Sequence, residues 1–496
     1  MNERPGAICA GFFVYFSGVK PTKMKQNITQ EEFNEKLKSS DEFYDEIFNF
    51  GDNSFYFPKD IKYNIKFEDC SFTGRNFIFS DIDRSDISLY FFECVFKCAF
   101  KVTNSNLNSL LFFNTKEIED LSLKSYSRKE FTISNFMFSY DNKSTVEVIN
   151  NFEFSSYNFK TFQFENANMT NGSFLISKCN IDNNENKFQK VTFSRSNIYN
   201  FRMIESNLNG DVSFFKTNFP YHTGYFNEKA EKFPTLKNCT FSNIDFSNCN
   251  FSQTFGIFRC IFMGTSYFSN VKNIYLGDLR IMYSIFNKHS VFDLANLESL
   301  IIYDCKFSDY FSAQRTKFNR INITKTIFDK ATFFDDLIII NAYSCKRHTI
   351  RTIKQQLQKA ENRIDYNRFR AYELAAYYRE LKFHKNFVDK SILGLTTLFT
   401  GYNYNWFRAF IVTVLTGMLF YSMLYFFEFY VALNLNNDDD FSSGAFRFFL
   451  VTDFFSPFLD RKYLNNGYSW TIFVLGKIFI AFGIYEMIQA FRKFKA

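Results

Sequence analysis

The stretch FEDCSFTGRNFIFSDIDRSDISLYFF, residues 67–92, decides the fold of this chain. It has a large apolar residue at every fifth position: Phe67, Phe72, Phe77, Ile82, Ile87 and Phe92. This spacing fits neither the 3.6-residue period of an α-helix nor the two-residue period of an ordinary strand. The period returns in the ranges 154–174, 188–208, 236–251 and 318–343. A repeat that covers so much of the chain predicts a solenoid.

Small residues accompany the large ones in a fixed place. Two residues before many central apolar positions the chain has a small side chain, as at Ser80, Ala167 and Thr316. If five residues form one side of a square coil, each side points one large and one small side chain inward. Four sides close a coil of about 20 residues, and stacked coils exchange backbone hydrogen bonds as neighbouring strands do. Residues 67–343 then give about 14 coils around a dry interior.

The cysteines follow the same pattern. Eight of the ten stand two residues before a large apolar residue, namely Cys70, Cys94, Cys98, Cys179, Cys239, Cys249, Cys260 and Cys305. Small buried hydrophobic residues have this placement, and Cys is often fully buried. Because the chain has no CxxC pair, we expect reduced packing thiols in the cytosol in preference to disulfides or metal ligands.

Several repeats resemble a known family. The segments Ser80-Asp81-Ile82, Ala167-Asn168-Met169 and Ser196-Asn197-Ile198 are similar to the unit A(D/N)LXX of pentapeptide-repeat proteins, with Phe in place of Leu at most other central positions. The resemblance covers a little over half of the chain and implies a right-handed quadrilateral β-helix. Some members of the family mimic DNA with an acidic flank, but the repeat segment here is net basic, so we expect no such role and no nucleic-acid partner.

The two ends of the repeat segment, 61–346, require covers because a terminal coil exposes free strand edges. We predict that residues 1–60 form the N-terminal cap. The capping-box pattern from Thr29 to Glu32, followed by Phe33, Leu37, Phe43 and Ile47, suggests one or two short helices there.

From Ile350 onward the five-residue period gives way to a helical one, with Ile353 and Leu357 on one face. We predict a helical hairpin within residues 347–406, a basic collar with a net charge of about +6. A solvated charged face is one interpretation of this charge. The position just before a hydrophobic span favours the other, contact with anionic lipid heads.

Residues 407–496 are predicted to be a two-span transmembrane domain. Ala409–Phe427 is free of charged residues and is long enough, as a helix, to cross a bilayer core. Trp470–Phe491 forms a second span, interrupted by Lys477 and Glu486. Basic residues precede the first span and follow the second, so the positive-inside rule places both termini in the cytoplasm. We therefore expect a multi-pass protein of the cytoplasmic (inner) membrane.

The loop between the spans contains an unusually apolar segment, 444–458. It is too short to cross the bilayer, and we interpret it as a re-entrant or interfacial helix, which gives the layout of a simple ion-channel pore unit. The C-terminal third resembles the tail of bacterial membrane-anchored pentapeptide-repeat proteins in three segments, 368–373, 456–458 and 484–494. The TVGYG filter loop of potassium channels is absent from the sequence.

Four residues of this domain are candidates for lining a pore or contacting a second protomer: Lys477, Glu486, Asp453 and Pro457. A lysine at bilayer depth costs about 2.5–3.5 kcal/mol on insertion scales, so Lys477 should face a partner helix or a wet lumen. Glu486 is placed near the cytoplasmic interface. The alternative is that Lys477 snorkels to the interface and that Glu486 pairs with Arg492 or Lys493.

The sequence carries no sign of catalysis. A hydrophobic share of 46% with 21% aromatic residues excludes a disordered chain, but no nucleophile elbow, P-loop, dinucleotide or kinase motif is present. The four histidines are isolated, so we expect no metal, no cofactor and no enzymatic activity. The leading hypothesis is a membrane-anchored solenoid that binds, senses or scaffolds a protein partner. The alternatives are an oligomeric pore gated by the solenoid and a plain spacer.

Overall fold

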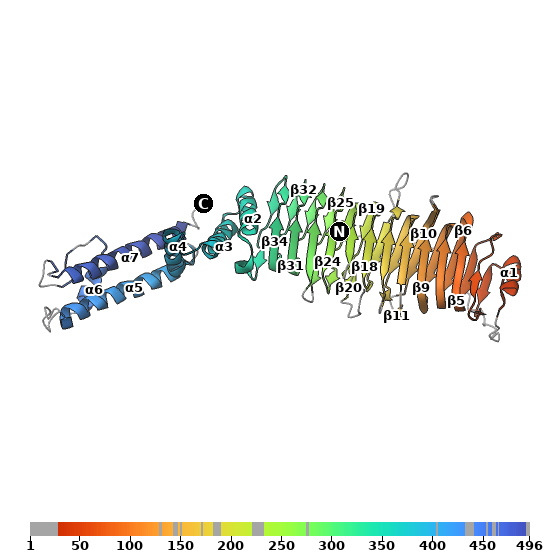
Figure 1. Ribbon diagram of the computed structural model, residues 1–496, viewed down its shortest axis with the longest axis horizontal. Coiled ribbons are helices and arrows are strands. Elements are labelled where there is room, and N and C mark those ends of the chain that lie inside the picture. Colours follow the sequence, from red (N-terminus) through yellow and green to blue (C-terminus); the bar gives the residue numbers. More distant parts are fainter. Residues whose placement is uncertain are drawn as a thin grey trace, which may run out of the picture.

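The computed structural model describes residues 28–127, 131–141, 147–148, 151–169, 172–181, 190–220, 233–273, 277–402, 405–431, 441–452, 455–458, 463–464 and 466–492. The chain forms a long rod of stacked strands, with one helix at its N-terminal end and a group of helices at the other end (Figure 1). The two longest helices extend beyond the rod and lie side by side.

The rod is a parallel β-solenoid, as predicted. Strands of successive turns pair in parallel and in register, so that Phe43 lies beside Phe67 and Phe67 beside Phe91. In the N-terminal half the strands are long: β4 (Ile65–Glu68), β5 (Ser71–Ser80), β6 (Asp83–Phe92), β7 (Val95–Thr103), β8 (Asn106–Phe113), β9 (Glu117–Lys124), β10 (Phe131–Ser139) and β13 (Tyr157–Glu165). In the C-terminal half many have two residues: β25 (Ile261–Phe262), β26 (Ser266–Tyr267), β29 (Ile285–Phe286), β30 (Ser290–Val291), β32 (Lys306–Phe307), β33 (Phe311–Ser312), β35 (Ile327–Phe328) and β36 (Thr332–Phe333).

The solenoid has about 11 turns, fewer than the 14 predicted. Some turns approach the expected length, as between Phe91 and its neighbour Phe112 and between Phe286 and Phe307. Elsewhere a turn takes 27 residues, from Cys179 to Ser206, or 29, from Ala167 to Ser196. Long strands with register shifts and insertions between repeats use these extra residues.

The core is built from columns of phenylalanine. Phe72, Phe164 and Phe246 are fully buried and Phe328 nearly so, which confirms that the five-residue period marks the interior. Along one column, stacked rings of Phe262, Phe286 and Phe307 have centroids 4.4 and 4.6 Å apart. These distances are close to the separation of neighbouring strands, so the backbone ladder itself sets the ring spacing.

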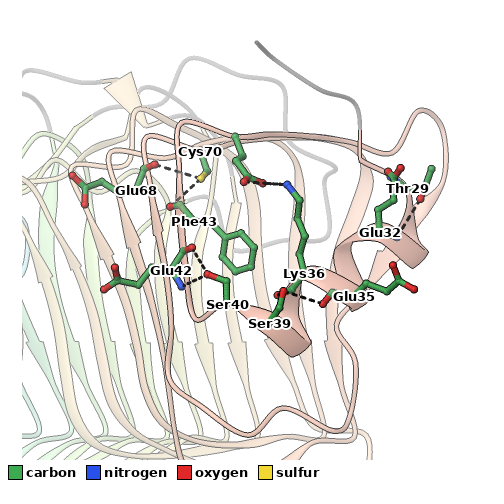
Figure 2. A network of polar contacts seen from close by, with 11 residues as sticks. Thr29, Glu32, Glu35, Lys36, Ser39, Ser40, Glu42, Phe43, Glu68 and Cys70 are labelled. Carbon is green, nitrogen blue, oxygen red and sulfur yellow. Dashed lines mark hydrogen bonds and ion pairs between the residues drawn. The ribbon is translucent and has the colours of Figure 1, made fainter. Parts of the chain in front are cut away.

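The small residues lie at the corners of the coil. Most follow a residue with a left-handed backbone, such as Asp69 before Cys70 (φ 55°) or Asn238 before Cys239 (φ 53°), while Ser80 and Cys98 do not. The eight cysteines of the pattern are buried, as expected. In seven of the eight, all but Cys98, the thiol donates to a main-chain carbonyl, for example from Cys70 to the carbonyls of Phe43 and Glu68 at 3.6 and 3.4 Å (Figure 2). The corner thiol or hydroxyl therefore ties one turn to the turn before it.

The N-terminal cap is a single helix, α1 (Gln30–Ser39), within the described residues. The predicted capping box is present: Thr29 Oγ1 accepts from the Glu32 amide while Glu32 accepts from the Thr29 amide (Figure 2). Phe33 packs against the first ring column, and the Lys36 ammonium binds Glu46 at 3.0 Å. The apolar face of α1 thus covers the exposed end of the solenoid.

The helical interpretation of the next apolar residues was wrong. Phe43 lies in β1 (Glu42–Tyr44) and Ile47 in β2 (Ile47–Asn49), which pair with β4 and β5 and, with β3 (Ser54–Tyr56), form the first turn. The solenoid therefore begins inside the range 1–60 that we predicted as a cap. Two apolar residues four positions apart, such as Phe43 and Ile47, fit an α-helix and a solenoid turn equally well. Backbone pairing with the next turn decides between the two structures.

Helices follow the solenoid at its C-terminal end, and the first two of them cover its last turns. They are α2 (Arg347–Lys359), α3 (Arg363–Glu380), α4 (Phe387–Thr400), α5 (Trp406–Phe426), which continues as a π-helical turn η2 (Phe427–Val431), α6 (Phe441–Phe449) and α7 (Gly467–Arg492). The predicted pair α2 and α3 packs on the last turns through Ile350, Ile353 and Leu357 of α2 and Phe369 of α3. Helix α4 then connects this collar to α5 and α7 (Figure 1).

Candidate functional site in the C-terminal helices

Two helices are long and apolar enough to cross a membrane. They are Trp406–Tyr430 and Gly467–Phe491, each a few residues longer than predicted from the sequence. Most of their surface points away from the rest of the chain, with side chains such as Leu415, Leu419, Ile478 and Ile488 exposed. A core helix of a water-soluble protein would bury such residues.

Glycines bring α5, α6 and α7 together. A β-carbon at Gly417 would lie 2.4 Å from the Phe449 ring, and one at Gly476 would lie 2.6 Å from Phe448. A β-carbon at Gly483 would lie 2.1 Å from Thr413 Oγ1. Small residues at these crossings allow the close helix packing that is typical of membrane proteins.

Lys477 is buried among α5, α6 and α7, with 4% of its surface exposed. Its ammonium group donates to the carbonyls of Arg447 and Leu450, at 3.4 and 2.5 Å. It also lies over the rings of Phe448 and Phe473, 5.5 and 5.1 Å from their centroids. The last carbonyls of a helix lack partners within that helix and carry its negative dipole end, so Lys477 acts as a C-terminal cap for α6.

Glu486 lies nine positions after Lys477 on α7, which places it about two and a half helical turns away from Lys477. We call α5 and α7 together the hairpin. Glu486 too is 4% exposed. Its carboxylate accepts hydrogen bonds from Thr396 at 3.3 Å and Thr400 at 3.0 Å, both on α4. Glu486 therefore ties α7 to the helix that leads to the collar.

Sequence reasoning missed a third buried ionisable group, Glu428. It lies in the π-helical turn at the end of α5, is fully buried, and accepts a hydrogen bond from the Ser469 hydroxyl at the start of α7. The signal was available, because Glu428 is the one acidic residue within the run Phe426–Tyr430. The predicted span, Ala409–Phe427, ends one residue before Glu428.

The remaining candidates belong to the connection between the spans. Pro457 is buried beside Ser456, whose hydroxyl accepts from the Phe458 amide. Asp453 lies outside the described residues. Among its described residues, the segment predicted at 444–458 is helical only in its first part, where α6 covers Phe441–Phe449 and contacts both α5 and α7.

One acidic residue organises the collar. Glu373 of α3 accepts from Arg351 at 2.8 Å and from Lys354 at 2.5 Å, both on α2. Burial raises the pKa of the Glu373 carboxyl, but the hydrogen bonds and positive charges of Lys354 and Arg351 outweigh it, so its pKa lies below the usual value. Two of the basic residues of the collar, Arg351 and Lys354, are thus paired with Glu373 within it.

We expect Glu373→Gln to destabilise the collar by about 1–2 kcal/mol at pH 7, since Arg351 is partly exposed and screened. A lowered carboxyl pKa contributes stability above the unfolded value of about 4.3, and this contribution is lost as the pH falls through the folded value. The difference between variant and wild type should therefore vanish in acid. Amide hydrogen exchange across α2, corrected at each pH for the intrinsic exchange rate, measures it. Glu380→Gln, at an exposed pair with Arg347, is the control, and equal exchange in the two variants at pH 7 would contradict the prediction.

We expect Glu486→Ala to loosen α4 by about 1–3 kcal/mol, because the Thr396 and Thr400 hydroxyls lose a buried charged acceptor. Amide hydrogen exchange across Thr396–Thr400 in detergent should accelerate. Tyr485→Ala, which removes an exposed neighbour on α7, should leave exchange unchanged. Unchanged exchange in Glu486→Ala as well would show that the contact carries no stability.

Comparison with protein-family models, curated proteins and solved structures finds no match to this chain. Among the residues that the structure describes, no three His, Cys, Asp or Glu side chains gather as a metal site requires. The candidate site is therefore a set of three buried ionisable residues that hold helices together. Glu428 joins α5 to α7, Lys477 joins α7 to α6, and Glu486 joins α7 to α4.

Proposed function

We propose that this protein is a non-enzymatic membrane-anchored member of the pentapeptide-repeat proteins, whose solenoid acts as a binding, sensing or scaffold module on the cytoplasmic face. The observation that carries the proposal is the direct connection of a capped rod, through a packed collar, to two helices long enough to span a bilayer. The five-residue period and the left-handed corners support the pentapeptide-repeat assignment. A rod of this kind offers a long regular surface to a protein partner.

Membrane insertion is tested on the full chain. Membranes from cells that express it are extracted with alkaline carbonate, which removes peripheral proteins but leaves spanning helices in place. We expect the protein to stay in the membrane pellet. Recovery in the soluble fraction would overturn the anchor, and with it both the leading proposal and its alternative.

Orientation is tested by thiol labelling in intact cells. The described native cysteines are buried, so in a Cys9→Ser background a cysteine introduced at exposed Tyr126 of the solenoid reports its side of the membrane. With both termini in the cytoplasm, an impermeant maleimide should label Tyr126→Cys only after lysis. Labelling of intact cells would reverse the orientation.

The second candidate function is an oligomeric pore whose opening the solenoid controls. Three buried ionisable residues within an apolar hairpin favour it, since such residues often mark ion pathways. The purified full chain in planar bilayers should then give currents that change in Lys477→Met. Absence of current at every oligomeric state would exclude the pore, and the binding, sensing or scaffold module would remain as the proposed function.

A further inference from the structure

Helix α4 is partly buried against the hairpin and partly exposed to solvent. Thr396, Phe399 and Thr400 are buried against α7, where Phe399 meets the ring of Phe482 with centroids 5.4 Å apart. Outside these contacts, and mainly in the first two turns of α4, Phe387, Val388, Ile392 and Leu398 are 57, 66, 51 and 52% exposed. We call these four residues, together with Phe383 just before the helix, the juxtamembrane face.

The position of this face relative to the hairpin is fixed. Glu486 holds α4 through Thr396 and Thr400, and the Arg408 guanidinium at the start of α5 donates to the carbonyl of Leu398. Trp406 and Phe491, the first residue of one long helix and the last of the other, stack with centroids 5.0 Å apart. Aromatic residues at the ends of spanning helices mark the membrane–water boundary. The C-terminal end of the juxtamembrane face, at Leu398, therefore lies at the level where lipid headgroups begin.

The charges around this face are basic. Residues 382–389 are all exposed and include Lys382 and Lys385. Lys390 is turned back to the carbonyl of Leu381 at 2.8 Å and orders the segment before α4. The acidic residue here is Asp389, which at about 100° per residue lies about 160° around α4 from Phe387 and about 100° from Val388. Lysines beside exposed aromatic and aliphatic side chains are the composition of helices that lie in a membrane interface.

We propose that α4 and the segment before it form an in-plane anchor, which inserts the juxtamembrane face between the headgroups of an anionic lipid leaflet. The proposal rests on the membrane anchoring proposed above and adds the site of lipid contact and its preferred charge. The lysines bind lipid phosphates while Phe383, Phe387 and Val388 enter the acyl boundary. The contact to Glu486 then transmits the position of the lipid surface to α7.

The contact is tested with bimane attached to single cysteines of the full chain in nanodiscs, in a Cys9→Ser background. Labels are placed at Val388 on the face, at Asp389 off the face and at Leu415 midway along α5. Lipids with a nitroxide near the headgroup or along the acyl chain act as quenchers. We expect the Val388→Cys label to lose most of its fluorescence to the headgroup-proximal nitroxide, the Asp389→Cys label to lose little, and the Leu415→Cys label to be quenched from the acyl chain.

The outcomes separate the two proposals. Quenching at Leu415 without quenching at Val388 overturns the in-plane anchor and leaves the spanning helices in place. Quenching at neither position overturns both. Equal quenching at Val388 and Asp389 also overturns the anchor, since it would show no oriented face.

The charge preference has its own test. In nanodiscs of phosphatidylcholine with an equal amount of phosphatidylglycerol, the preference of the protein for spin-labelled phosphatidylglycerol is measured by the fraction of immobilised lipid. We expect Lys382→Gln and Lys385→Gln to reduce this preference by about fivefold each. Lys97→Gln and Lys272→Gln, exposed on the solenoid, should not change it. An unchanged preference in the first pair would assign the lipid contact to apolar insertion alone and overturn the anionic specificity.

Discussion

Phe246→Ala is expected to destabilise the solenoid by about 3–5 kcal/mol, the range for truncating a buried phenylalanine. The ring is fully buried and is stacked between Phe214 and Phe268, with centroids 4.6 and 5.1 Å away. It also meets Phe255 edge-on at 5.4 Å. The rigid backbone ladder on either side prevents the turns from collapsing into the space, so most of the cavity should persist.

The change should be read as a shift in the denaturant midpoint of the strand signal in circular dichroism, with new protease sensitivity near residue 246. Tyr267→Ala is the matched control, because that side chain belongs to the next turn but points outward. Surface changes of this kind usually stay within about 0.5 kcal/mol. If both variants unfolded alike, the Phe columns would not carry the stability of the rod.

Lys477→Met should detach α6 from the hairpin at a cost of about 2–5 kcal/mol, because the carbonyls of Arg447 and Leu450 lose their donor in an apolar setting. Removing the charge acts in the opposite direction on insertion, where a central lysine costs about 2.5–3.5 kcal/mol. The two effects fall on different steps. The variant should therefore insert at least as well as the wild type, while α6 loses its fixed place.

Hydrogen exchange across α6 in detergent or nanodiscs measures this loss. Lys477→Arg keeps a cationic donor and should restore part of the protection, whereas Lys385→Met removes an exposed lysine and should change nothing. Protection of α6 that is equal in Lys477→Met and the wild type would show that glycine-mediated packing alone holds this helix.

The solenoid could be predicted because its cause is local. A large side chain at every fifth position and a small one two residues before it define an inside and an outside without any knowledge of distant residues. The number of turns could not be predicted in this way, because it is not set by the local sequence. The strands of neighbouring turns, such as β5 and β7, shift register between Thr73 and Asn76, and the length of each turn depends on what its neighbour accommodates.

The membrane part shows the same division. Length and apolarity gave the two long helices, and the sequence marked Lys477 and Glu486 as exceptions within them. Of the settings expected for Lys477, the structure shows contact with a neighbouring helix, since the C-terminal end of α6 supplies its acceptors. Glu486 accepts hydrogen bonds from two threonines of α4, and the side chains of Arg492 and Lys493, its expected partners, lie outside the described residues. Partners of this kind come from segments up to 90 residues away, beyond any spacing rule.

By itself the sequence determined that a phenylalanine-filled coil is followed by a basic helical region and two apolar helices, because repeat period and hydropathy act within a few residues. The tertiary structure alone decided that Phe43 and Ile47 open the solenoid, that Glu373 gathers the collar, and that three buried charges join α7 to its neighbours. A buried charge is stable only where donors or acceptors from other elements meet it, and their meeting is a property of the folded chain.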